Sequence, residues 1–162
     1  MKVAIYPGTF DPITYGHIDV IKKSLNVFDR VIVATTDNIN KNYHFSIEDR
    51  LSIINNSLFK DLKFSRNKIK VVSFDNLTID LCKKYKASTI IRGLRAVSDF
   101  EYEFQLAGMN KKLNSKIETM FLMSDVENQI ISSKFVREIV SLGGNIDRFV
   151  TRSTVKMLKN KI

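Results

Sequence analysis

The chain opens on the segment Val3-Ala-Ile-Tyr-Pro-Gly-Thr-Phe-Asp-Pro-Ile-Thr-Tyr-Gly-His17, which predicts a β-strand, a tight loop and the start of a helix in direct succession. Both prolines of the chain and two of its six glycines fall within these residues, so the loop backbone is strongly constrained. His17 stands in the first turn of an amphipathic helix, where free N–H groups and the helix dipole favour a phosphate. A plain strand-to-helix connection would not need so many constraints together, and we therefore predict an anion-binding unit.

The rest of the chain predicts strands that alternate with helices. Apolar runs indicate strands at 3–6, 30–35, 69–74, 89–92 and 118–123. Helical periodicity and capping residues indicate helices over 77–85, 99–114 and 151–161. They also indicate one helix that begins near His17, one that runs from a cap at Ser46 through Leu58, and one that follows Ser132-Ser133. Five such alternations without internal repeats predict an α/β fold, a doubly wound, Rossmann-like, five-stranded parallel sheet in a single domain over residues 1–162.

The polar motifs of the sequence follow the ends of the predicted strands. In doubly wound sheets, ligands bind beyond the carboxyl ends of the strands, near the point where the strand order reverses. The segments that follow the five predicted strands are 8–17, 36–41, 74–78, 92–95 and 124–133. We therefore expect these five segments to meet at one edge of the sheet and to form a common ligand site there.

Composition limits the classes of protein that the chain can represent. No run of about 18 apolar residues indicates a membrane span, and no N-terminal signal pattern is visible, so we expect a cytoplasmic protein without a membrane partner. The only cysteine, Cys82, cannot form an internal disulfide or a cysteine-based zinc site, and its helical context predicts a buried thiol.

The formal net charge of +9 fits nucleic acid, an acidic membrane or small anions as partners, and charge alone does not choose among them. Many of the lysines lie in 60–86 and 111–116 without the interleaved aromatic residues of single-strand binders. We interpret them as solvated surface and expect no nucleic-acid partner, although a basic nucleic-acid-binding module remains the alternative from another class.

Several familiar devices for binding phosphate or metal are missing from the sequence. There is no G-x-x-x-x-G-K-[ST] motif, no G-x-G-x-x-G motif and no acid-rich or paired-histidine metal cluster. We therefore predict no protein-held metal, and any metal should arrive with nucleotide phosphates. The cations and hydroxyl groups that remain suit a reaction between two anions, in which positioning and charge neutralisation supply the rate.

Three motifs carry a resemblance to a known family. Thr14-Tyr-Gly-His17 resembles the T/H-x-G-H signature of the nucleotidyltransferase superfamily. The opening segment and the run Arg92-Gly-Leu-Arg-Ala-Val-Ser-Asp-Phe-Glu-Tyr-Glu103 are similar to bacterial phosphopantetheine adenylyltransferases. Ile131-Ser-Ser-Lys-Phe-Val-Arg137 resembles the I-S-S-T/S-x-x-R/K element of the superfamily, with Lys134 in place of a hydroxyl residue.

This resemblance implies a reaction and its participants. It implies transfer of the adenylyl group of ATP, bound with Mg²⁺, to 4'-phosphopantetheine, which gives dephospho-coenzyme A and pyrophosphate. It also implies a homohexamer. A nucleotidyltransferase that acts on another phosphate acceptor is the alternative within the same fold. The segment 125–130 lacks an aromatic residue that some relatives have, so its contacts with adenine are the least defined part of the prediction.

The resemblance also implies roles for individual residues. The predicted catalytic residues are His17, Thr9, Lys41 and Arg95. The residues predicted to bind the acceptor are Thr9, Lys41, Thr78 and Arg92. The residues predicted to bind ATP are Thr9, Phe10, His17, Gly93, Leu94, Arg95, Glu103, Asn128, Gln129, Ile130, Ile131, Ser132, Ser133 and Lys134.

Overall fold

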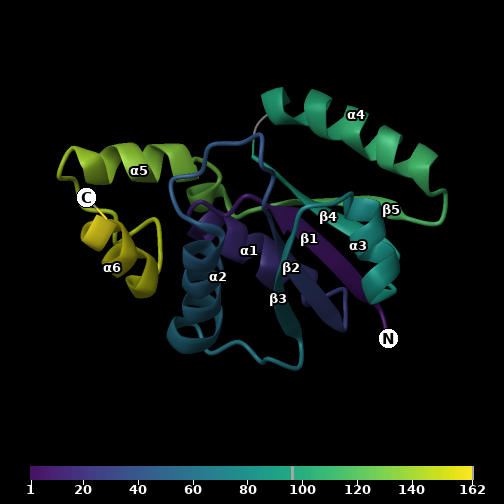
Figure 1. Cartoon of the computed structure of the whole chain (residues 1–162), viewed down its shortest axis with the longest axis horizontal. Coiled ribbons are helices and arrows are strands. Elements are labelled where there is room, and N and C mark those ends of the chain that lie inside the picture. The colour runs from purple at the N-terminus through teal and green to yellow at the C-terminus, as the bar shows by residue number, and fades with distance from the viewer. Residues whose placement is uncertain (96, 162) are drawn as a thin grey trace.

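Five parallel strands form one sheet in a computed structural model that describes residues 1–95 and 97–161 (Figure 1). The strands are β1 (Val3–Gly8), β2 (Arg30–Thr36), β3 (Ile69–Phe74), β4 (Thr89–Leu94) and β5 (Glu118–Met123). Their order across the sheet is β3-β2-β1-β4-β5, and every neighbouring pair is parallel. The order reverses at β1, which places the loop after β1 at the centre of the edge where ligands bind. The predicted doubly wound parallel sheet is confirmed.

Helices connect the strands and pack against the sheet. They are α1 (Tyr15–Ser24), α2 (Ile47–Asn55), α3 (Thr78–Tyr85), α4 (Val97–Leu113), α5 (Ser133–Ser141) and α6 (Arg152–Lys161), with a π-helical turn η1 (Asn56–Asp61) and a 3₁₀ turn η2 (Val126–Asn128). None of the helices within the described ranges is long and apolar enough to cross a membrane.

The core has two parts, one on each face of the sheet. Ala4 and Tyr6 of β1 belong to the larger cluster, which includes residues of α1, α2, α5 and α6. Val3 and Ile5 point to the other face and join the smaller cluster with residues of α3, because successive side chains of a strand alternate between faces. Cys82 lies in this smaller cluster, wholly buried, and burial raises the pKa of its thiol to about 11.

The predicted element boundaries need few changes. β3 and β5 begin and end where the sequence predicted, and Gly143 adopts the left-handed conformation (φ 77°) expected after α5. The predicted helix from Ser46 through Leu58 is instead α2 followed by η1, so its continuous α-helical form was wrong. Within η1, the Ser57 hydroxyl forms a buried hydrogen bond of 2.7 Å with Thr151 just before α6, a long-range contact that local periodicity does not indicate.

Candidate active site

A cleft of about 590 Å³ opens at the carboxyl edge of the sheet, where the loops after β1, β2, β4 and β5 meet. Segments that lie more than 100 residues apart in the sequence, from the loop after β1 to the start of α5, share its walls. The predicted site residues that line it are Thr9, Phe10, His17, Lys41, Arg92, Gly93, Leu94, Arg95, Glu103, Ile131, Ser132, Ser133 and Lys134. The sheet edge that the sequence indicated therefore carries a cleft lined by most of the predicted site residues.

Four predicted residues lie outside the lining of this cleft. Thr78 is the first residue of α3, after β3, the strand at the far edge of the sheet. The Asn128 amide donates to the Asp19 carboxylate at 2.6 Å, and the Gln129 amide donates to a backbone carbonyl at 3.1 Å. The Ile130 side chain is 80% exposed. The bond to Asp19 and the bond to the backbone carbonyl hold the Asn128 and Gln129 side chains outside the cleft lining.

His17 is held by the start of α1. The Thr14 backbone N–H donates to the His17 Nδ1 atom at 3.1 Å, and the Phe10 ring packs edge-on against the imidazole with centroids 5.1 Å apart. A backbone N–H can only donate, so Nδ1 is the acceptor and the ring proton lies on Nε2. His17 thus enters the cleft as a neutral hydrogen-bond donor that its own helix cap orients.

We expect His17 to stay neutral through the physiological range. Burial, with a smaller contribution from the positive charge of Arg95, lowers the pKa of His17 to about 4 from an ordinary 6.5. The unfolded chain takes up this proton at about pH 6.5, so the folded state loses stability as the pH falls from about 6.5 toward 4.

The His44→Ala variant, in which His17 is the only histidine left, tests this prediction by NMR. The chemical shift of the His17 imidazole carbon should stay constant from about pH 8 to 5. A midpoint near pH 6.5 would contradict the arrangement.

Phe10 has a structural part in the loop. Its backbone is left-handed (φ 47°), and its buried ring lies edge-on to Tyr6 with centroids 5.3 Å apart. A Cβ atom on Gly8 would come within 2.8 Å of this ring, so the position requires glycine. Because the ring is packed inside, we expect the nucleotide contact predicted for Phe10 to be made by its backbone, not by its ring.

Arg92 and Glu103 form the main ion pair of the cleft. Arg92 Nε and Nη2 donate to the two oxygens of the Glu103 carboxylate, each at 2.6 Å, and Nη1 donates to the Pro7 carbonyl at 3.2 Å. Two parallel charge-assisted bonds fix the guanidinium plane. The pair therefore joins α4 to β4 and to the last residues of β1.

The cleft carries an excess of positive charge. Its lining contains the cations Lys41, Arg92, Arg95, Lys134 and Arg137 and the carboxylates Asp11, Asp99 and Glu103. Each of these carboxylates is engaged: Glu103 by Arg92, Asp99 by Arg95 at 3.6 Å, and Asp11 by two backbone N–H groups. A polyanion is the ligand that such a surface favours.

Hydrogen bonds of Asp11, Arg137, Ser132 and Ser133 hold the first loop and the start of α5. The Asp11 carboxylate accepts from the N–H groups of His44 and Phe45 at 2.7 and 2.9 Å, and Arg137 donates to the Asp11 carbonyl. The Ser133 hydroxyl donates to the Pro12 carbonyl at 2.7 Å, while Ser132 caps α5 by accepting from Phe135 N–H. Asp11 stood in the quoted opening segment and Arg137 in the quoted last motif, but neither was given a role, because the partners of Asp11 are more than 30 residues away.

Comparisons with known proteins agree on one family. Residues 5–139 match the family described as cytidylyltransferase-like. A protein of Pelagibacter ubique (strain HTCC1062) named phosphopantetheine adenylyltransferase is 68% identical over 160 residues, which cover 99% of this chain and 98% of that protein. A protein of the same name from Vesicomyosocius okutanii subsp. Calyptogena okutanii (strain HA) is 47% identical over 161 residues, which cover 99% of each chain.

A solved structure shares the fold. The crystal structure of a candidate nicotinate-nucleotide adenylyltransferase from Vibrio parahaemolyticus aligns with a TM-score of 0.73 over 98% of this chain and 99% of that chain. The sequences are 22% identical. The similarity shows a common architecture and leaves the identity of the acceptor to other observations.

Proposed function

Because this chain belongs to the phosphopantetheine adenylyltransferases of the cytidylyltransferase-like family, we propose that it transfers the adenylyl group of ATP to 4'-phosphopantetheine, giving dephospho-coenzyme A and pyrophosphate. The proposal rests on one observation: a neutral His17 lies in the same cleft as several cations, at the point where the strand order of the sheet reverses. This arrangement suits a reaction in which two polyanions must approach each other.

The proposed reaction needs no covalent intermediate. A phosphate oxygen of the acceptor attacks the α-phosphorus of ATP in line, and the bond to the β-phosphate oxygen breaks as pyrophosphate leaves. Nε2–H of His17 donates to a developing negative charge on the α-phosphate, and Lys41 and Arg92 hold the acceptor phosphate. Arg95, Ser132, Ser133 and Lys134, around the start of α5, hold the phosphates of ATP.

We also propose that Mg²⁺ enters as part of the ATP substrate. The carboxylates of the cleft lining are already engaged by arginines or backbone N–H groups, and the described residues contain no group of three or more histidine, cysteine or acidic side chains suited to a metal. Hard oxygen ligands from ATP phosphates suit Mg²⁺. We place the reaction in the cytoplasm, without a membrane or nucleic-acid partner.

Product analysis tests the proposed function. Purified protein with ATP, Mg²⁺ and 4'-phosphopantetheine should yield dephospho-coenzyme A and pyrophosphate in equal amounts. The matched reaction with nicotinate mononucleotide or nicotinamide mononucleotide should yield no dinucleotide. Adenylylation of a mononucleotide, without formation of dephospho-coenzyme A, would assign another acceptor. Salt-dependent binding of a random oligonucleotide that excess ATP does not displace would favour a nucleic-acid-binding module.

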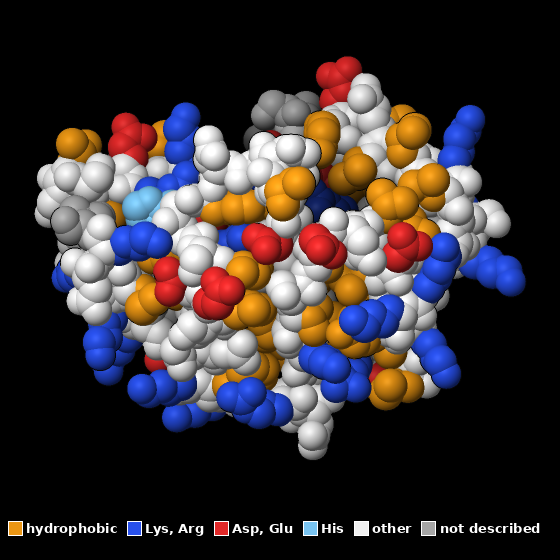
Figure 2. Space-filling view, in the orientation of Figure 1, with side chains coloured by type: hydrophobic (Ala, Val, Ile, Leu, Met, Phe, Trp, Pro, Cys, Tyr) orange, Lys and Arg blue, Asp and Glu red, His pale blue; other side chains and the backbone are white. Residues whose placement is uncertain are grey.

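We further propose that the chain assembles as a homohexamer through the exposed apolar side chains of α4. Tyr102 and Phe104 are 65% and 63% exposed, and Met109 and Leu113 extend the same helix with side chains more than half exposed. Figure 2 shows apolar side chains gathered over the α4 side of the molecule. An exposed apolar surface of this kind is typical of a protein–protein interface.

Substitution of Phe104 by Glu should shift the protein from the hexameric to a smaller mass in light scattering coupled to size-exclusion chromatography, because a charge in an apolar interface is costly to desolvate. The matched control is Leu142→Glu, at a site that is 82% exposed after α5. The control should elute as the unmodified protein does. An unchanged mass for Phe104→Glu would place the interface elsewhere.

A further inference from the structure

Arg50 of α2 is a charged side chain with no exposed surface. Its Nη1 atom donates to the Thr9 carbonyl at 3.1 Å, to the Thr36 carbonyl at 2.7 Å and to the Thr35 hydroxyl at 3.1 Å. Its Nη2 atom lies 3.3 Å from the Asp37 carboxylate. One guanidinium therefore joins the loop after β1 to the end of β2.

Burial of this charge is costly, and a single ion pair does not offset the cost. The only carboxylate in its described salt bridges, that of Asp37, is 46% exposed and is therefore screened by solvent. Nε has no hydrogen-bond partner among the described residues. Carbonyl oxygens and an aromatic face supply the remaining stabilisation, so the geometry of the loops, rather than charge pairing, determines where the guanidinium lies.

The same guanidinium supports the loop that carries Lys41. The Arg50 guanidinium carbon lies 3.9 Å from the centre of the Tyr43 ring. The Tyr43 hydroxyl accepts from Asn38 N–H at 3.0 Å, and Lys41 N–H donates to the Asn38 carbonyl at 3.0 Å. The loop from Asn38 to Tyr43 is thus closed on itself and stacked on Arg50.

We propose that Arg50 is a positioning residue, which holds the Thr9 loop and the Lys41 loop in one fixed relation while the guanidinium itself stays out of the cleft. The inference rests on the proposed function, in which Lys41 holds the acceptor phosphate, and on the acceptor-binding role that the resemblance implies for Thr9. A guanidinium suits this position because its planar set of N–H groups donates to two carbonyls and a hydroxyl while one face stacks on Tyr43. A lysine ammonium group keeps the charge but loses this planar donor geometry and the stacking.

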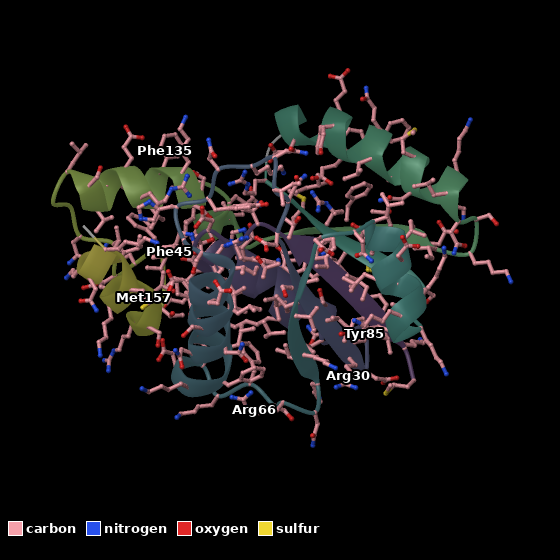
Figure 3. The ribbon with its side chains drawn as sticks, in the orientation of Figure 1. Arg30, Phe45, Arg66, Tyr85, Phe135 and Met157 are labelled. Carbon is pink, nitrogen blue, oxygen red and sulfur yellow. The ribbon has the colours of Figure 1, made fainter. Side chains whose placement is uncertain are left out.

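The first test is steady-state kinetics of Arg50→Lys. We expect kcat to fall on the order of 10²-fold, because displacement of reacting groups by about 1 Å has this effect. The KM for 4'-phosphopantetheine should rise about tenfold, while the KM for ATP stays within about twofold. The matched control is Arg66→Lys, since Arg66 also stacks on an aromatic ring, that of Phe59, at 4.1 Å. Figure 3 shows Arg66 at the end of the molecule away from α4 and α5.

A purely structural role predicts a different result. Arg50→Lys would then lower the melting temperature and leave kcat and both KM values unchanged well below that temperature, and this outcome would overturn the proposal. Failure of the proposed function is distinguishable, because the unmodified protein would then form no dephospho-coenzyme A at all.

Tyr43 variants keep the test decisive if Arg50→Lys does not fold. Tyr43→Leu removes both the stacking and the bond to Asn38, and we expect it to raise the KM for 4'-phosphopantetheine about tenfold with the KM for ATP unchanged. Tyr43→Phe keeps the ring over Arg50 and should have the smaller effect on the same KM. A Tyr43→Leu variant with unaltered kinetics would overturn the proposal.

Discussion

Replacement of His17 by Ala is expected to lower kcat by about 10²–10³, because the variant loses one preorganised donor to the charge that develops in the transition state. The Nδ1 bond from Thr14 N–H holds the ring with Nε2–H free to donate, and the pKa of about 4 keeps it neutral at the pH of the reaction. Single-turnover formation of dephospho-coenzyme A is the measurement. A folded His17→Ala variant with full turnover would remove this residue from the mechanism.

Two controls separate catalysis from capping. His17→Ala also removes the acceptor for Thr14 N–H and should cost about 1 kcal/mol of stability. His17→Gln keeps an acceptor at the third position of a capping box and should recover this stability, yet its kcat should stay at least about tenfold below that of the unmodified protein because its donor is displaced. His44→Ala alters the other histidine of the chain, which is not among the cleft residues, and should leave kcat unchanged.

The second large effect is expected for Arg92→Met. This substitution leaves the mostly buried Glu103 carboxylate without its bidentate partner, which should lower the free energy of unfolding by about 3 kcal/mol. It also removes a cation proposed to hold the acceptor phosphate, so kcat/KM for 4'-phosphopantetheine should fall at least about 10²-fold. Chemical denaturation and initial-rate kinetics measure the two effects independently.

The double variant Arg92→Met with Glu103→Leu tells these effects apart. Replacement of both members of a buried ion pair by apolar residues is often neutral for stability, so the free energy of unfolding should return to within about 1 kcal/mol of the original value. The activity should stay low, because the cation is still missing. Recovery of activity together with stability would show that Arg92 acts only by holding α4 in place.

Local patterns predicted the parts of this structure that local forces determine. The apolar runs of β3 and β5 and the glycine after α5 specify their own conformations, and the structure confirms them. The meeting in one cleft of the segments after β1, β2, β4 and β5 also followed from sequence, because parallel strands bring their carboxyl ends to one edge. The segment 74–78 after β3 was predicted to join them and lies outside the cleft lining. The resemblance then named the residues, and the lining of the cleft contains most of them.

Local sequence patterns could not predict contacts between segments that lie far apart in the chain. In the sequence, Arg50 is one polar residue of a predicted amphipathic helix. Only the fold brings its guanidinium to the Thr9 carbonyl, 41 residues away. The pairing of Arg92 with Glu103 depends on how α4 packs, which periodicity does not determine. Asn128 turns to Asp19 of α1, 109 residues earlier. In each case the partner of a polar side chain lies in a distant segment that only the fold brings close. From the sequence alone, one sees that the side chain is polar but not which group it will bind.

The burial of Cys82 has a consequence for redox chemistry. The proposed acceptor ends in a thiol, and an accessible protein thiolate would attack the disulfide form of such a molecule, giving a mixed disulfide and releasing the other thiol. The only cysteine of the chain, Cys82, lies on the buried face of α3 in the core, and its raised pKa of about 11 disfavours the thiolate at neutral pH. The protein therefore offers oxidised pantetheine no partner for disulfide exchange. The thiol of this enzyme thus stays unmodified whether the thiol-bearing molecules around it are reduced or oxidised.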